Sequence, residues 1–272
     1  MFDFRRITSA TDNYNFHSHT QFCDGRVDMS TMAEAACSAG MKAWGFSPHS
    51  PVNVESPCNM LAIDVPIYIK EASRLREAYA GRMEIFTAME IDFISREFGP
   101  HIDYFRELPL DYRIGSVHFV PTQKGKPVDC DGSYERFARN LQAKFQGDLR
   151  YVVEKYFGQV MEMLSLGGFD MLGHADKIAG NAALARPGIE EENWYGDLIR
   201  QTFDAAKSAG VAVEINTKSL DKLGRFFPAC RWWSGIPGNI DIAVNSDAHF
   251  PDLVNAGRRE ALAALRQSGR LQ

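Results

Sequence analysis

The 272-residue sequence lacks the features that mark membrane, secreted and nucleic-acid-binding proteins. No run reaches about 18 uncharged apolar residues, so we expect no membrane span. The first ten residues, MFDFRRITSA, lack the apolar core of a signal peptide. Lys and Arg number 30 against 35 Asp and Glu, and the formal net charge of −5 offers no general basic field to duplex DNA. We therefore expect neither a membrane nor a nucleic-acid partner.

Cysteine is scarce and forms no recognisable pattern. The five cysteines are an odd number and no CxxC pair occurs, so we expect neither a disulfide framework nor a cysteine-based zinc site. Together with the missing export signal, this favours a reduced, cytoplasmic protein. A chain of this size buries roughly 75% of the surface that its unfolded form exposes. It therefore needs no disulfide or metal ion merely to fold.

No low-complexity tract, Pro/Ser-rich linker or internal repeat divides the chain, which predicts a single domain over residues 1–272. A short apolar strand, a polar tip and a helical stretch recur in that order. We predict strands over residues 14–20, 42–49, 84–93, 112–119, 169–174, 211–216 and 240–245. We predict helices over residues 29–39, 66–80, 133–166 with a break at Gly147, 193–209 and 254–267. This alternation implies parallel pairing with right-handed crossovers. Seven strands favour an α/β fold of the TIM-like barrel type, with an open sheet as the alternative.

Reactive side chains gather at the predicted carboxyl ends of these strands, where β/α barrels carry their chemistry. Six of the seven histidines lie there, and only His101 does not. Residues i and i+2 of a strand face the same side, so His17 and His19 can point into one mouth, as can Asp247 and His249. Imidazole and carboxylate together suit zinc, iron or manganese. A single histidine at a strand end is more often structural, but histidines on successive strand ends predict a metal site.

An ordered set of sequence motifs from about Tyr14 to His249 resembles the PHP family, named for polymerase and histidinol phosphatase. The motifs are FHSHTQFCDG, FSPHSP, AMEIDF, YRIGSVHF, LGHADK, EINT and NSDAH. IGSVHF and EINT resemble the stand-alone histidinol-phosphatase branch. The resemblance implies a distorted seven-stranded (β/α)7 barrel of the PHP type, with a metal cluster, usually trinuclear, at its mouth.

The resemblance also implies which side chains hold the metal. It points to three divalent ions (Zn, Fe or Mn) and nine ligands, with Glu90 bridging two of the ions. The ligands of the first ion would be His17, His19, Glu90 and Asp247; of the second, Glu90, His118 and His174; and of the third, Asp24, His49 and His249. Every position of the family pattern is filled by a competent ligand, so the pattern gives no sign of an inactive enzyme.

The charge of such a cluster favours a phosphoesterase. Three divalent ions bring +6 and the ligands −3, from Asp24, Glu90 and Asp247, which leaves +3 for a hydroxide and a phosphate dianion. The expected mechanism has a metal-bridging hydroxide attacking phosphorus in line. We expect Glu90, Asp247 and His249 to be catalytic. Asp247, His249 or a metal-bound water would assist the leaving alkoxide.

Three cations just past strand ends are candidate substrate-binding residues: Lys177, Lys218 and Arg26. The alternative for each is a solvated surface cation. Asp92 is expected to support a ligand from outside, and Asp176 is either a partner of His174 or an outer polar residue. The aromatic run of Phe226, Phe227, Trp232 and Trp233 favours ordinary packing over a substrate wall. Candidates for the non-phosphate end of the substrate are Asp92, Glu55, Asp176, Phe226 and Phe227.

The leading hypothesis is a metal-dependent phosphomonoesterase that hydrolyses L-histidinol phosphate in histidine biosynthesis, a substrate taken from the resemblance. A second hypothesis keeps the site and changes the substrate to another small phosphate ester. A third is a PHP module of a DNA polymerase, acting on nucleic-acid ends or as a support, which the chain length and weak acidity disfavour. A metal-binding scaffold without activity is the last. The sequence assigns no oligomeric state and no role to residues 133–166.

Overall fold

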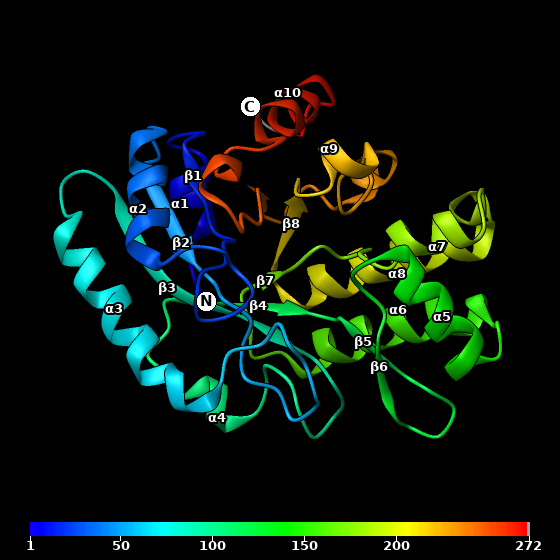
Figure 1. The fold of residues 1–272 in the computed structure, drawn as a ribbon. Coiled ribbons are helices and arrows are strands. Elements are labelled where there is room, and N and C mark those ends of the chain that lie inside the picture. Colours follow the sequence, from blue (N-terminus) through cyan, green and yellow to red (C-terminus); the bar gives the residue numbers. More distant parts are fainter. Residues whose placement is uncertain (271–272) are drawn as a thin grey trace.

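Seven short strands form one parallel sheet in the computed structural model, which describes residues 1–270 (Figure 1). They are β1 (Tyr14–Asn15), β2 (Ala43–Phe46), β3 (Glu84–Asp92), β4 (Tyr112–Ser116), β7 (Met171–Leu172), β8 (Ala212–Asn216) and β9 (Ile242–Asn245). Their order in space follows the chain, and every neighbouring pair is parallel. Such neighbours require crossover connections, which the helices supply. The predicted α/β class and the seven predicted strands are confirmed.

The two edge strands of this sheet are joined mainly by side chains. The Phe16 N–H donates to Oδ1 of Asn245 over 2.8 Å, and the Ser246 N–H donates to Oδ1 of Asn15 over 2.7 Å. Beyond these bonds, one isolated parallel bridge joins the segments that follow β1 and β9. Because β1 is only two residues long, asparagine side chains satisfy backbone groups that a longer ladder would pair. The result is a nearly closed barrel, as predicted.

Several strands are shorter than predicted because the backbone turns where the polar residues begin. Strands predicted to reach residues 20, 49 and 174 end at Asn15, Phe46 and Leu172. At His174 the backbone has φ 22°, and at Asp247, just past β9, φ is 50°. Neither value is compatible with a strand. The apolar pattern located the strands, and the turn at His174 limits β7.

The predicted strand over residues 112–119 is two elements. β4 ends at Ser116, and β5 (Phe119–Pro121) pairs in antiparallel fashion with β6 (Pro127–Asp129) outside the barrel sheet. The turn between them places Gly125 at φ 78°, a conformation that favours glycine. The sequence reading missed this hairpin, which brings residues 129–132 to the edge of the barrel.

Helices cover the outside of the sheet on both flanks (Figure 1). The α-helices are α1 (Phe4–Thr8), α2 (Met29–Ser38), α3 (Val65–Ala78), α4 (Asp103–Arg106), α5 (Tyr134–Phe145), α6 (Leu149–Leu166), α7 (Ala179–Ala185), α8 (Asn193–Ala209), α9 (Leu220–Leu223) and α10 (Arg258–Gln267). Four 3-10 turns are η1 (Ala62–Asp64), η2 (Ile189–Glu191), η3 (Cys230–Gly235) and η4 (Pro251–Leu253). Within the described chain, no helix combines the length and apolarity needed to cross a membrane.

Local signals explain most helix ends. The predicted break at Gly147 separates α5 from α6, because Gln146 and Gly147 have φ 57° and 79° and the Asp148 carboxylate accepts from the Tyr151 N–H. α8 has its predicted bounds and ends before Gly210 at φ 70°. The closing helix was predicted from residue 254 but begins four residues later, since a 3-10 turn and a glycine with positive φ precede it.

Aromatic side chains fill the amino-terminal end of the barrel. Phe4 of α1 lies 5.0 Å from Phe16 and 5.3 Å from Tyr112 between ring centroids, in edge-to-face contacts. All three rings are buried, in one cluster with small and apolar residues from the other strands. Such pairs add to the stabilisation from burial. This plug closes one end of the barrel and leaves the opposite end for polar chemistry.

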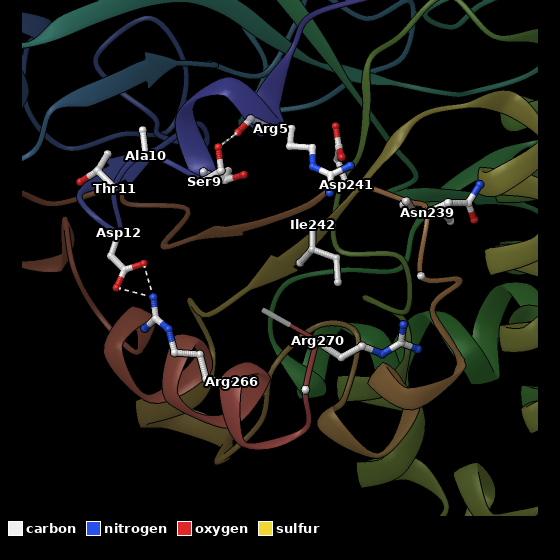
Figure 2. A pocket seen from close by; sticks show the side chains of 14 residues that line it. Arg5, Ser9, Ala10, Thr11, Asp12, Asn239, Asp241, Ile242, Arg266 and Arg270 are labelled. Carbon is white, nitrogen blue, oxygen red and sulfur yellow. Dashed lines mark hydrogen bonds and ion pairs between the residues drawn. The ribbon is translucent and has the colours of Figure 1, made fainter. Parts of the chain in front are cut away.

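A pocket of about 620 Å³ lies between α1, the segment that precedes β9, and α10 (Figure 2). Arg5, Arg266 and Arg270 line it together with Asp12 and Asp241. Arg266 makes two hydrogen bonds to the Asp12 carboxylate, of 2.7 and 2.8 Å. The pocket is therefore a charged hollow at the amino ends of the strands.

Candidate metal centre

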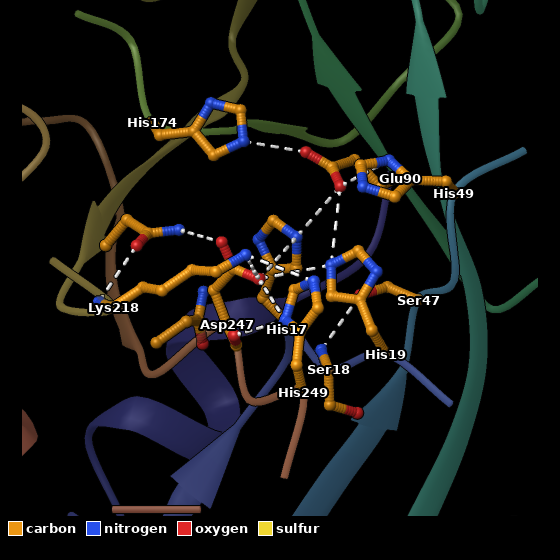
Figure 3. A network of polar contacts seen from close by, with 12 residues as sticks. His17, Ser18, His19, Ser47, His49, Glu90, His174, Lys218, Asp247 and His249 are labelled. Atoms are coloured by element: carbon orange, nitrogen blue, oxygen red, sulfur yellow. Dashed lines mark hydrogen bonds and ion pairs between the residues drawn. The ribbon is translucent and has the colours of Figure 1, made fainter. Parts of the chain in front are cut away.

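The carboxyl ends of the strands and the loops that follow them form what we call the mouth of the barrel. All nine predicted ligands lie there, on the ends of β1, β2, β3, β4, β7 and β9 or the loops that follow them. Figure 3 shows seven of them: His17, His19, His49, Glu90, His174, Asp247 and His249. Seven of the nine are buried: His17, His19, Glu90, His118, His174, Asp247 and His249. His49 and Asp24 are partly exposed. A cluster this rich in ionisable groups is rarely buried without a partner of opposite charge.

Glu90 lies at the centre of the mouth. Five imidazoles have a nitrogen within 3.6 Å of its carboxylate: those of His17, His19 and His49 at Oε2, and those of His118 and His174 at Oε1. Burial opposes ionisation of Glu90, but His49, His17 and His118 outweigh it and hold its pKa well below the usual range. An ionised carboxylate with ligand nitrogens at both oxygens is suited to bridge two ions.

A second group surrounds Asp247 (Figure 3). Its Oδ1 lies 3.1 Å from Nε2 of His19, 3.3 Å from Nδ1 of His249 and 3.3 Å from Nζ of Lys218. Nε2 of His249 lies 3.1 Å from Oδ1 of Asp24. Burial raises the pKa of Asp247, but Lys218, His17 and His19 outweigh it and lower that pKa strongly. This group therefore combines carboxylates with imidazoles around a second point of the mouth.

Several buried nitrogen and oxygen atoms in the mouth have no hydrogen-bond partner among residues 1–270. They are Nε2 of His17, Nε2 of His19, Oδ1 of Asp24, Nδ1 of His49 and Nδ1 of His174. A buried polar atom without a partner costs free energy, so each one calls for an explanation. Four groups of side chains place their donor atoms within 4.8 Å of one another: His19, Asp24, His49 and His249; His17, His19 and Asp247; His17, Glu90 and His174; and His49, Asp92 and His118. Their nitrogen and oxygen atoms fit divalent ions such as zinc.

Two carboxylates outside the ligand set orient the imidazoles. Oε1 of Glu214 lies 2.7 Å from Nδ1 of His17, and its Oε2 accepts from the His174 N–H over 2.8 Å. Oδ1 of Asp92 lies 2.6 Å from Nδ1 of His118, in the supporting place predicted for it. A histidine that donates from Nδ1 presents the lone pair of Nε2 to a metal. The sequence analysis gave Glu214 no role. A signal was present in the EINT motif, because Glu214 and Asn216 are two residues apart on one strand and therefore share a face.

The pKa shifts of the histidines reflect what surrounds each ring. Burial lowers the pKa of His17, but Glu214, Glu90 and Asp247 outweigh it and raise that pKa well above normal. Burial also lowers the pKa of His118, and there Asp92 and Glu90 raise it to about 10. At His19, burial and the neighbouring imidazoles of His249 and His49 together lower the pKa strongly. Carboxylates therefore crowd one part of the mouth and imidazoles another.

Backbone strain coincides with the ligands. The only residues other than glycine with positive φ in the described chain are Gln146, a helix end, and the two predicted ligands His174 and Asp247. A non-glycine residue in this region costs about 1–3 kcal/mol and persists only where the surroundings enforce it. At both ligands the turn directly follows a strand and aims the side chain into the mouth.

The structure brings two of the three predicted phosphate anchors into the mouth. Lys218 lies against Asp247 and His249, with its Nζ 3.1 Å from Nε2 of the histidine. Lys177 is largely buried and its Nζ lies 3.6 Å from Oδ2 of Asp131. The Arg26 N–H donates to the His249 carbonyl, but its side chain is exposed and makes no ion pair within residues 1–270. Arg26 therefore lies at the rim.

Asp176 differs from both interpretations of the sequence. It is fully buried, and its Oδ2 accepts from the Ala229 N–H over 3.1 Å and lies 3.7 Å from an Arg225 nitrogen. Burial raises its pKa to about 7, against the opposing charge of Arg225. Residues 174–179 form helical turns, so the strand rule that places i and i+2 on one face does not apply. Asp176 thus turns away from His174 into the interior.

The aromatic run behind the mouth is packing, as predicted. Phe226 lies 5.2 Å from Trp233 between ring centroids, and Phe227 is buried beneath two cations. Nζ of Lys177 lies 5.3 Å from the centroid of Phe227, and the Arg225 guanidinium lies 5.0 Å from it. The ring therefore supports Lys177 from below.

A family model described as the PHP domain matches residues 15–218, which is most of the chain. This chain belongs to the PHP family. Two curated relatives match most of its length. The probable histidinol-phosphatase of Deinococcus radiodurans is 26% identical over 265 residues, covering 93% of this chain and 92% of the relative. The histidinol-phosphatase of Bacillus subtilis is 28% identical over 252 residues, covering 86% and 92%.

Two solved structures share the PHP barrel. A candidate histidinol phosphatase from Listeria monocytogenes superposes with a TM-score of 0.79 at 21% identity, covering 91% of this chain and 99% of its own. A histidinol phosphate phosphatase from Lactococcus lactis, solved with zinc, L-histidinol and phosphate, gives 0.68 at 18% identity, covering 95% and 94%. At these identities the likeness shows the fold.

Proposed function

We propose that this PHP protein is a metal-dependent phosphomonoesterase that hydrolyses L-histidinol phosphate to L-histidinol and phosphate in histidine biosynthesis. The observation that carries the proposal is the buried mouth, in which five imidazoles surround one ionised carboxylate and several nitrogen and oxygen atoms make no hydrogen bond. The names of the curated relatives support the choice of substrate.

The proposed ligands are the nine residues predicted from the sequence. They would hold three divalent ions, zinc, iron or manganese, with Glu90 shared between two of them. Divalent ions supply positive charge for a phosphate dianion and lower the pKa of bound water toward neutrality. The zinc in the Lactococcus lactis protein agrees with the donor set of this chain.

The other residues of the mouth have roles that follow from their contacts. Glu214 and Asp92 orient His17 and His118 by hydrogen bonds to Nδ1. The phosphate dianion meets the Lys218 ammonium, whose Nζ lies 3.3 Å from Oδ1 of Asp247. Asp247 and His249, which lie beside this ammonium, or a metal-bound water would assist the leaving alkoxide. Burial of the mouth excludes bulk water and strengthens each of these interactions.

A phosphate-release panel with metal-reconstituted protein tests the proposal. L-histidinol phosphate, serine phosphate, an aryl phosphate and a short single-stranded oligonucleotide are compared by kcat/KM. Hydrogen bonds to the amine and imidazole predict a preference for L-histidinol phosphate on the order of 10²-fold or more. If another small ester is preferred, the phosphatase proposal stands with a different substrate. If the oligonucleotide is preferred, the proposed small-molecule chemistry is wrong.

We also propose that the protein acts in the reducing cytoplasm on a small phosphate ester, without nucleic acid. All five cysteines are free in the structure, which is consistent with that setting. The mouth is lined with imidazoles and carboxylates, and its cations are two single lysines in place of a basic stripe.

A further inference from the structure

The metal-ligand set accounts for only one end of the proposed substrate. L-histidinol phosphate also carries an α-ammonium, and only the ester oxygen and two carbons separate this nitrogen from phosphorus. An acid that recognises the ammonium must therefore lie close to the ligands, inside the mouth. It must also have a carboxylate oxygen that a substrate can reach.

The acids suggested by the sequence do not meet these conditions. Asp92 is buried and occupied, because His118 contacts one oxygen and the Asn59 amide donates to the other over 2.8 Å. Asp176 faces Arg225 in the interior. Glu55 is exposed and makes no hydrogen bond or ion pair within residues 1–270.

Asp131, which the sequence reading did not single out, meets both conditions. It follows β6 in the hairpin that the sequence did not predict, and its side chain is 36% exposed. Its Oδ2 lies 3.6 Å from Nζ of Lys177, whose side chain is only 9% exposed. This distance is too long for a direct hydrogen bond, so the two charges face each other without being locked together.

Three hydrogen bonds hold the backbone around Asp131 in place. The Asn181 amide donates to the carbonyls of Cys130 and Gly132, over 3.2 and 3.4 Å. The Cys130 N–H donates to the carbonyl of the ligand His118 over 2.9 Å. The carboxylate of Asp131 is therefore presented from a fixed segment tied to the metal-ligand set.

The charges of the mouth also act on this pair. Burial opposes ionisation of Asp131, but Lys177, His118 and Lys218 outweigh it and lower its pKa. Burial likewise works against the Lys177 ammonium, and Asp131, Asp247 and Glu90 outweigh it and raise its pKa. Asp131 is thus an ionised acid within the field of the ligands, and Lys177 is a cation within the same field.

We infer that Asp131 and Lys177 form a pair that the substrate separates, with Asp131 receiving the α-ammonium and Lys177 the phosphate dianion. The inference rests on the proposed function, for which it names the specificity-determining residue. Asp131 exchanges the Lys177 ammonium for the substrate ammonium, and Lys177 exchanges the Asp131 carboxylate for the phosphate. Neither charge therefore loses its counterion. An ester without the ammonium would take Lys177 and leave the Asp131 carboxylate unpaired. The pair therefore favours phosphate esters of amino alcohols over esters that lack the ammonium.

The test compares Asp131→Asn with wild type on two esters, L-histidinol phosphate and the same ester without its amine. A hydrogen bond to a charged group predicts a loss of kcat/KM for L-histidinol phosphate of about 10- to 100-fold. The ester without the amine should not lose kcat/KM, since it never makes this bond and the amide has no charge to be left unpaired. Asp197→Asn is the matched control, because Asp197 is an exposed acid of α8 that pairs with Arg200 and makes no contact with Asp131. This control should leave kcat/KM for both esters nearly unchanged.

Product inhibition provides a second measurement that loss of folding would not mimic. In Asp131→Asn, the inhibition constant of L-histidinol should rise by a factor similar to the loss of kcat/KM, and that of inorganic phosphate should not rise, because phosphate makes no bond to Asp131. Equal losses on the two esters, or unchanged inhibition by L-histidinol, would overturn the inference while the proposed function stands. Failure of wild type to hydrolyse either ester would instead overturn the proposed function.

Discussion

The two ends of the barrel both carry charged residues in a hollow, yet the charges are in different states. At the carboxyl end, seven of the nine proposed ligands are buried, and several of their nitrogen and oxygen atoms make no hydrogen bond among the described residues. At the amino end, Arg266 and Asp12 bond each other over 2.7 Å, and each side chain is 44% exposed. One set of charges is desolvated and incomplete, and the other is solvated and paired.

This difference shows what distinguishes a reactive site from a polar hollow. An exposed ion pair contributes about 0–1 kcal/mol and is readily replaced by water. A desolvated cluster whose polar atoms lack hydrogen bonds costs free energy unless a ligand binds to it. The strained backbone at His174 and Asp247 occurs at the same end of the barrel. Chemistry is therefore expected at the carboxyl end, and substitutions at the two ends should have very different effects.

Removal of metal should produce the largest difference. Chelation should reduce phosphatase activity to background, because the proposed chemistry depends on the ions. The barrel should remain folded, since its aromatic plug and helical layers do not use them. Far-UV circular dichroism should be retained, and the melting temperature should fall, because a ligand that binds the native state stabilises it. Loss of circular dichroism together with activity would show that the ions are structural.

Glu90→Gln is expected to be the most damaging single substitution. It removes the charge that five imidazoles surround, and kcat/KM should fall by on the order of 10²- to 10³-fold, the scale of losing one group that stabilises the transition state. Bound metal, measured by elemental analysis, should fall as well. His101→Ala is the control, since Nε2 of His101 lies 2.8 Å from the Arg96 carbonyl, away from the mouth. Near-normal turnover and full metal content in Glu90→Gln would exclude the bridging role.

Glu214→Gln should have an intermediate effect. The amide cannot accept from both His17 and the His174 N–H as an ionised carboxylate does, and loss of such an outer partner costs about 10- to 100-fold in metal affinity or activity. Metal titration followed by kcat/KM at saturating metal separates these two effects. Asp176→Asn is the matched comparison, because this buried acid bonds no ligand. It should keep its metal affinity while losing thermal stability, and equal metal loss in both variants would remove the special role of Glu214.

Arg266→Ala should give the smallest effect and represents the amino end. It removes the exposed pair with Asp12, so the free energy of unfolding should fall by less than about 1 kcal/mol. Urea denaturation measures this change, and kcat/KM with metal content serves as the functional readout. A clear loss of activity would show that the two ends are coupled and would break the contrast drawn above.

The sequence by itself determined the features that depend on neighbouring residues. Apolar runs located the seven strands, and Gly210 ended α8 at the predicted residue. The spacing of His17 and His19 indicated that both face one side, and the structure places them side by side in the mouth. Strand alternation and helix ends are local properties of the backbone, so they can be inferred from a single sequence.

Only the tertiary structure decided which distant groups meet. Glu214 and His17 are 197 residues apart, and the barrel brings them within 2.7 Å. Asp176 has the strand spacing from His174, yet the chain turns helically there and the side chain goes elsewhere. Asp131 faces Lys177 because a short hairpin leaves the sheet after β4. Such pairings depend on how elements pack and on where the backbone leaves the strand conformation, and both are settled by the whole fold at once.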